Sequence, residues 1–196
     1  MAQKKRRVPT AQRQEQIIRA ATSLIAEQGL SGASMGRIAE IVGISEPAIY
    51  RHFENRREIL LAVLDGVSMR LITIYNPEGD AINRIKRTSE AFYNFVMTHP
   101  EDARVLLEFV CSSPSEGLRE NVREKMLLII GMARGLLDEG VRQGSLKKNL
   151  DIDTKAWEIF SHGFTLNFAS LLGFGDYLTR DKAMSIIESI IAQIKK

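Results

Sequence analysis

The sequence predicts an all-α protein of about nine helices. Apolar residues recur at helical spacing along nearly the whole chain, and the alternation that is typical of strands is scarce. Short breaks that contain Gly, Pro or Ser divide this pattern into segments of helical length. A chain of 196 residues can bury a substantial core without disulfides, and its single cysteine, Cys111, allows no intramolecular one.

The N-terminal end is predicted to form a basic arm followed by a first helix. Residues 1–8 are rich in Lys and Arg and poor in apolar side chains, so we expect a flexible arm. Thr10 is a suitable N-cap for the first helix. Gly29 should end that helix in a left-handed conformation, with Leu30 folding back as a hydrophobic contact.

Two short helices are predicted next, each opened by a serine. Ser34 should cap the first, and Gly43 should end it because glycine adopts the left-handed conformation without strain. Ser45 should cap the second. Pro47 falls in the first turn of that second helix, where a missing N–H costs nothing.

The rest of the chain is predicted to form six longer helices. Asn55 is a suitable cap for a helix that runs from Arg56 toward Tyr75. Residues 76–79, Asn-Pro-Glu-Gly, then interrupt the helical pattern. Five further helices are predicted near residues 80–98, 101–111, 116–143, 152–172 and 180–195.

The charge is unevenly distributed along the chain. The net charge is +3, but residues 1–57 hold ten Lys or Arg against five Asp or Glu. The remaining residues hold seventeen basic and nineteen acidic side chains. A basic N-terminal third on a slightly acidic body suggests that this end meets a polyanion, although a solvated basic tail gives the same counts.

Residues 34–50 have the layout of a helix-turn-helix motif, in which two short helices are joined by a glycine turn. Apolar residues of both short helices should lock them against the first helix, which leaves the second free to enter a DNA major groove. The sequence therefore predicts a DNA-binding domain over residues 9–56. Residues 57–196 are predicted to form a second helical domain.

Side chains around the short helices suit hydrogen bonds to DNA. Hydroxyls and free N–H groups at helix starts attract phosphates, and nearby Arg, Tyr and His side chains add donors. Glu46 and Ala48 are predicted to face the bases, with Ile49 in the core. The predicted DNA-contact residues are Ser34, Arg37, Ser45, Glu46, Pro47, Ala48, Tyr50, Arg51, His52 and Arg56.

The stretch from Ile38 to Phe53 resembles the signature of the tetracycline-repressor (TetR) family. The match continues through residues 54–60, and it includes the preceding helix with Ile17, Ala20, Ala21, Leu24 and Gly29. The resemblance covers roughly the first third of the chain. Pro47 replaces the more usual Gly, Lys or Ala, and Arg56 replaces the usual Lys; neither change upsets the predicted architecture.

The resemblance implies a homodimer that binds a palindromic operator, usually as a repressor. It also implies that the second domain binds a ligand and dimerises through its last two helices. On the last predicted helix, a wide apolar stripe can serve the core on one side and a partner on the other. The stripe consists of Ala183, Ile187, Ile190 and Ile194, widened by Met184, Ile186 and Ile191.

Aromatic and aliphatic residues of the second domain are predicted to line a pocket for a small, largely apolar effector. For each of them, packing in the core is the alternative. The predicted lining residues are Phe92, Phe95, Met126, Ile130, Trp157, Phe160, Phe164 and Phe168. Glu158 and His162 share a helix face, but zinc usually needs three or four ligands, so a hydrogen bond is favoured there over a metal site.

The sequence holds no nucleophile elbow, phosphate-binding loop or metal-ligand cluster, so we expect neither an enzyme nor a cofactor. No apolar stretch is long enough to span a membrane, and the N-terminus does not resemble a secretory signal. One cysteine fits a reducing cytosol. The family resemblance and the aromatic helix face together imply a ligand-responsive transcriptional repressor, which we expect to be cytoplasmic. The alternative is a DNA-binding regulator without a small-molecule effector, controlled by a protein partner.

Overall fold

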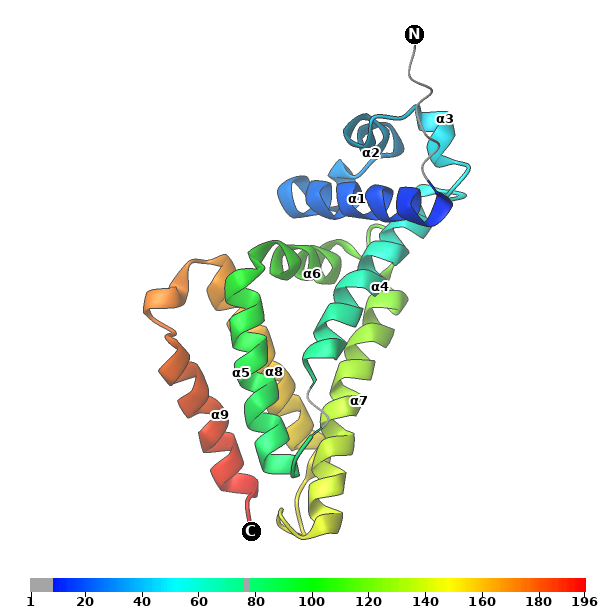
Figure 1. Cartoon of the computed structure of the whole chain (residues 1–196). Helices are drawn as coiled ribbons and strands as arrows, with labels where there is room; N and C mark the ends of the chain where they lie inside the picture. The colour runs from blue at the N-terminus through cyan, green and yellow to red at the C-terminus, as the bar shows by residue number, and fades with distance from the viewer. Residues whose placement is uncertain (1–8, 76–77) are drawn as a thin grey trace. The chain divides into compact units, whose positions relative to one another are not determined.

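The computed structural model describes residues 9–75 and 78–196, and within these it confirms the predicted all-α fold (Figure 1). The predicted arm at residues 1–8 and the Asn76-Pro77 part of the predicted break lie outside the described residues. The helices are α1 Thr10–Gly32, α2 Met35–Val42, α3 Glu46–Ile49, α4 Arg56–Ile74, α5 Ala81–Thr98, α6 Pro100–Ser112, α7 Arg119–Gln143, α8 Ile152–Leu171, the 3₁₀ turn η1 Phe174–Asp176, and α9 Arg180–Ile194.

The chain divides into two compact units. The first unit contains the chain up to Val67 together with Arg104–Leu118, and the second contains Ser68–Ala103 together with Arg119–Lys196. The boundary between the two units therefore falls within α4, whereas the sequence predicts that the DNA-binding domain ends at residue 56. The later part of α6 belongs to the first unit, whereas the sequence places it in the second domain. Hydrophobic periodicity could not predict this, because it locates helices without saying which of them pack together.

The first helix differs from the sequence prediction at both ends. The helix begins directly at Thr10, because the carbonyl of Pro9 accepts the N–H of Arg13 at 3.0 Å and Pro9 takes the cap position. Gly29 leaves the helical path with a φ of 75°, as predicted, and a further turn follows it as far as Gly32. Leu30 is fully buried in that turn.

The second helix has the predicted start and end. The Ser34 hydroxyl accepts the N–H of Arg37 at 3.3 Å. Gly43 has a φ of 73° and donates its N–H to the Glu40 carbonyl, while Ile44 donates to the Ala39 carbonyl at 3.1 Å. This pair of bonds is a Schellman motif, which satisfies carbonyls at the helix end and turns the chain toward α3.

Of the two side-chain caps predicted for α3 and α4, the structure contains only the second. The Ser45 side chain makes no cap bond, because Pro47 has no N–H and the N–H of Ala48 is bound at 2.8 Å by the Ser45 carbonyl. The prediction of a Ser45 side-chain cap was therefore wrong. Asn55 does cap α4, since its Oδ1 accepts the N–H of Glu58 at 3.0 Å.

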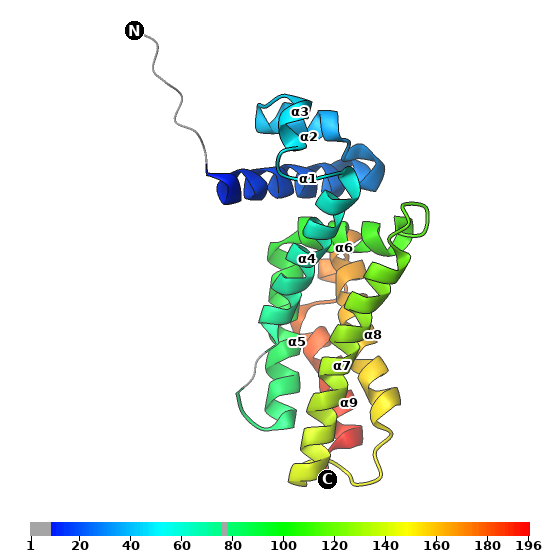
Figure 2. The same cartoon turned by 90° about the vertical axis from the view of Figure 1, so that its right-hand side faces the viewer.

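The second unit is a helical bundle in which α5, α7, α8 and α9 lie side by side (Figures 1 and 2). Its main core cluster joins all four helices and is lined by Ile85, Leu137, Ala156 and Ile187 among others. Tyr75 anchors the end of the α4 segment, donating its hydroxyl to the Met132 carbonyl at 2.6 Å. Burial raises the pKa of this phenol to about 12, so the hydroxyl stays protonated as a donor.

An ion pair links α4 to α6 within the same unit. Asp102 is only 5% exposed, and Arg70 donates to both of its carboxylate oxygens, with Nε to Oδ2 at 2.7 Å. A buried carboxylate is tolerated because this two-pronged pairing satisfies it.

Candidate nucleic-acid interface

The helix-turn-helix presents a polar face over an apolar base. Ile38, Ala39 and Ile49 are buried and hold α2 and α3 in place. Most predicted DNA-contact residues lie on the opposite, exposed side. The exposed members are Ser34, Arg37, Ser45, Glu46, Pro47, Tyr50 and Arg51, whereas Ala48, His52 and Arg56 are half-buried.

The arginines of this region fall into two groups. Arg37 and Arg51 are exposed, and within the described residues their guanidinium groups have no partner. Arg56 and Arg57 are instead engaged within the first unit: Arg57 donates to the Gly117 carbonyl at 2.8 Å. Free guanidinium groups beside a reading helix are suited to phosphate oxygens. Arg37 and Arg51 are therefore the arginines of this region that are available to bind an anion, and their contact with DNA stays a prediction.

Arg56 is the member of the predicted set whose guanidinium is already bound within the first unit. Its Nε donates to the Ala33 carbonyl at 2.9 Å, and its terminal nitrogens bind the Leu30 carbonyl and the Glu116 carboxylate, the latter at 2.5 Å. The guanidinium thus fastens the turn between α1 and α2 to the segment after α6. The sequence could not indicate the pairing with Glu116, which lies 60 residues away, and a contact of Arg56 with DNA stays a prediction.

A second acidic residue holds the same turn and was missed by sequence analysis. The Glu108 carboxylate accepts the N–H of Leu30 at 2.9 Å and the hydroxyl of Ser112 at 2.7 Å. A side chain on Gly29 would lie 2.8 Å from Glu108 Oε1, so glycine is needed for this approach as well as for its φ of 75°. A local sequence pattern cannot predict a contact between residues that lie 78 positions apart.

Glu46 and His52 have neighbours that restrict them. The Glu46 carboxylate lies over Gly36 of α2, 3.1 Å from where a Cβ would stand. His52 accepts the Gln14 side-chain amide on its backbone carbonyl at 3.2 Å, and its Nδ1 is buried without a partner among the described residues. Tyr50, by contrast, is 52% exposed and projects from the end of α3.

The predicted effector-pocket residues are scattered over the second unit. Phe92 and Phe95 pack on a small cluster around Val96 and Leu166, while Phe160 packs against the main core with Ile130. Phe92 lies across Gly163, with 3.4 Å from its Cε1 to the place of a Cβ. Met126 is half-buried on α7.

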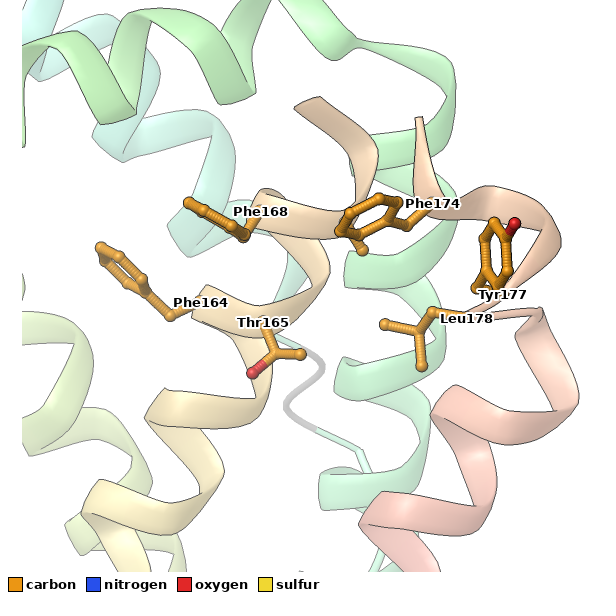
Figure 3. Close-up of a pocket in the computed structure, with 7 residues that line it drawn as sticks. Phe164, Thr165, Phe168, Phe174, Tyr177 and Leu178 are labelled. Carbon is orange, nitrogen blue, oxygen red and sulfur yellow. The ribbon is translucent and has the colours of Figure 1, made fainter. Parts of the chain in front are cut away.

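Three other members of that set lie beside open hollows on α8. One hollow, of about 400 Å³, is walled by Phe164, Thr165 and Phe168 from α8 and by Phe174, Tyr177 and Leu178 from the segment after it (Figure 3). A second, of about 510 Å³, contains Trp157, Glu158, Ser161 and His162 with Ile186 and Ile190 of α9. Thr165 lines both hollows. We call these two neighbouring hollows together the α8 groove.

The described residues contain no group of three or more His, Cys, Asp or Glu side chains arranged to hold a metal ion. Nor does any helix in the described ranges combine the length and apolar character that crossing a membrane requires.

Comparison with known proteins gives a match at the helix-turn-helix. Residues 17–63 match the family described as bacterial regulatory proteins, tetR family. The HTH-type transcriptional activator FasR of Mycolicibacterium smegmatis is 29% identical over 106 residues, which cover 52% of this chain and about half (48%) of FasR. The nucleoid occlusion factor SlmA of Vibrio cholerae is 26% identical over 132 residues, covering 65% of this chain and 67% of SlmA.

A solved structure extends the likeness of the fold to both units. The transcriptional regulator FadR of Bacillus subtilis, in complex with stearoyl-CoA, superposes with a TM-score of 0.72 at 22% identity. The match covers 90% of this chain and 96% of FadR. Together with the helix-turn-helix geometry, these findings show that residues 17–63 match the tetR family of bacterial regulatory proteins and that both units share the fold of a solved transcriptional regulator.

Proposed function

We propose that the protein is a homodimeric transcriptional repressor that a small, largely apolar ligand releases from a palindromic operator. The observation that carries the DNA-binding part is the exposed face around α2 and α3, where Arg37 and Arg51 have guanidinium groups without a partner among residues 9–75 and 78–196. Arg37 and Arg51 supply phosphate contacts that fix the register, and α3 with Tyr50 enters the major groove.

Two copies are needed because one reading helix is short. Helix α3 has four residues, so a single headpiece contacts few base pairs. A two-fold dimer places two such helices about one DNA turn apart, roughly 34–36 Å, and doubles the contacts. The α8 groove is the favoured dimer face, since α9 keeps Ala183, Ile187, Ile191 and Ile194 in the core and leaves Ile186 41% exposed beside the groove.

Replacing Arg37 or Arg51 by alanine should weaken operator binding roughly five- to twenty-fold, because each loses a charged phosphate contact. The slope of log affinity against log salt should also fall by about one per substitution. The measurement is fluorescence anisotropy on a duplex that the purified protein selects from random-sequence DNA. Arg123→Ala, an exposed arginine of α7 paired with Glu120, is the matched control and should leave both quantities unchanged. An unaltered salt slope in both test variants would contradict this DNA face.

The effector is proposed to be an apolar chain carrying a polar head, as in the stearoyl-CoA that FadR binds. The half-buried rings of α5 and α8 offer apolar surface for such a chain. Stearoyl-CoA should raise the thermal unfolding midpoint and weaken operator binding, because ligand and DNA that favour different conformers must oppose each other reciprocally. Free coenzyme A is the control. Stabilisation without any loss of operator affinity would argue against release by the ligand.

The alternative remains a DNA-binding regulator without a small-molecule effector. The similarity to SlmA, named a nucleoid occlusion factor, favours keeping this second candidate. It predicts that no acyl-CoA or other apolar ligand changes operator affinity, whereas the effects of Arg37→Ala and Arg51→Ala stay the same. The two candidates therefore separate in the ligand experiment alone.

A further inference from the structure

Gly36 is an exposed glycine inside a helix whose backbone does not require one. It lies in the first turn of α2 and has no positive φ, unlike Gly29 and Gly43. Glycine at such a position makes a helix less stable than alanine does, because the unfolded chain has more conformations to lose. A contact that Gly36 makes with α3 supplies a reason for glycine here.

The contact is with Glu46, the first residue of α3. The Oε2 atom of Glu46 lies 3.1 Å from the place of a Cβ on Gly36, and its Cδ lies 4.0 Å from that place. An oxygen at 3.1 Å from a carbon is closer than an ordinary van der Waals contact, so a side chain at residue 36 would push the carboxylate away. The bare backbone of Gly36 thus leaves the carboxylate a defined place over the start of α2.

The Glu46 carboxylate has no ion pair at that place. It is exposed, and within residues 9–75 and 78–196 it has neither a salt bridge nor a hydrogen-bond partner. The first N–H groups of a helix have no intrahelical acceptor, and the positive end of the helix dipole favours an anion beside them. The start of α2 therefore stabilises the carboxylate in place while its oxygens stay available to an outside donor.

The carboxylate lies on the face that carries the proposed DNA contacts. Ser34 and Arg37 at the start of α2 and Pro47 beside Glu46 are all exposed. In the proposed complex, a carboxylate on this face meets either phosphates, which repel it, or base edges in the major groove. Only cytosine N4 and adenine N6 present donors in that groove, so a carboxylate that reaches the bases distinguishes these two from guanine and thymine.

We propose that Glu46 is a specificity-determining residue that accepts a hydrogen bond from the N4 amino group of one cytosine in each operator half-site, with Gly36 as its positioning residue. The inference rests on the proposed operator binding. Cytosine is favoured over adenine because the N7 acceptor of adenine lies beside its N6 and repels the second carboxylate oxygen. Arg37 and Arg51 then fix the register on the phosphates, while Glu46 selects the base.

The test compares the base preference of Glu46→Gln with that of the wild-type chain. A duplex that the wild-type protein selects from random-sequence DNA is changed to all four base pairs at each position of one half-site, and fluorescence anisotropy gives each affinity. Wild type should prefer cytosine at one position over guanine or thymine by about tenfold. Glu46→Gln should lose this preference and bind adenine best there, because an amide supplies the acceptor and the donor that match adenine N6 and N7.

Two results would overturn the inference. One is a cytosine preference that survives Glu46→Gln. The other is an affinity that rises equally for every base pair, since the carboxylate would then only repel phosphates. Glu40→Gln is the matched control, because Glu40 is another exposed carboxylate of α2, and it should leave the base preference unchanged.

Gly36→Ala tests the positioning role. It should weaken the cytosine preference at least about threefold in the wild-type chain and change nothing further in a Glu46→Ala background. Thermal stability should stay equal or rise, because alanine favours the helix, so unfolding does not explain the loss. An equal effect in both backgrounds overturns the pairing of Gly36 with Glu46. A wild-type chain that selects no duplex overturns the proposed operator binding itself, whereas a selected duplex whose base preferences survive Glu46→Gln overturns this inference only.

Discussion

Replacing Arg56 by alanine should lower the free energy of unfolding by about 2–3 kcal/mol, because three acceptors lose their donor at once. The Leu30 and Ala33 carbonyls and the Glu116 carboxylate all depend on this guanidinium. For a chain of this size, the midpoint of thermal unfolding should fall on the order of 5–10 °C. Operator binding should weaken too, since Ala33 directly precedes the Ser34 cap of the helix-turn-helix.

The neighbouring Arg57 provides the matched control for Arg56. It carries the same charge, is exposed, and donates to the Gly117 carbonyl. Arg57→Ala should therefore cost less than about 1 kcal/mol. Arg56→Lys should fall between wild type and Arg56→Ala, because an ammonium cannot reproduce the fork of a guanidinium.

The same variant separates the two roles considered for Arg56. If it contacts DNA, as the sequence predicts, Arg56→Ala should reduce the salt dependence of operator binding by about one unit with little loss of stability. If it holds the turn, stability should fall while the salt dependence stays as in wild type. Circular dichroism melting and anisotropy titrations at several salt concentrations distinguish these results.

Local chemistry made the DNA-binding unit predictable from the sequence. Ser34, Gly43 and Asn55 act at helix ends through atoms a few residues away, and the structure confirms all three. Ser45 failed as a side-chain cap for an equally local reason, because Pro47 removes one N–H and the Ser45 carbonyl takes the next. The preference for serine as an N-cap therefore predicts a side-chain bond only where the N–H groups of the next residues are free to act as its donors.

Long-range contacts account for what the sequence did not predict. Glu108 accepts the N–H of Leu30, 78 residues away, and Glu116 binds Arg56, 60 residues away; neither acidic residue lies in a recognisable pattern. The same limit applies to the rings of α8. Helical spacing groups Trp157, Phe160, Phe164 and Phe168 on one broad face, but it cannot say that Phe160 packs in the core while Trp157 and Phe168 stay exposed.

Replacing different glycines of α7 by alanine should change the stability of the protein in opposite directions. Gly140 lies where helix and loop come close: an added Cβ would stand 2.7 Å from both Ala81 Cβ and Leu146 Cδ1. Gly131 and Gly135 of the same helix are exposed and have nothing within 4 Å of a Cβ among the described residues. The close contact is therefore at Gly140.

Gly140→Ala should destabilise the protein by about 2–3 kcal/mol, because neither Ala81 nor the fully buried Leu146 has room to move aside. Gly131→Ala and Gly135→Ala should each stabilise it by about 0.5–1 kcal/mol, since alanine restricts the unfolded chain and favours the helix. Urea unfolding with an unchanged m-value measures all three. Because all three variants place the same alanine in the same helix, helix propensity cannot explain a difference between them. A Gly140→Ala variant as stable as Gly135→Ala would mean that α5, α7 and the loop at Leu146 separate more easily than their packing implies.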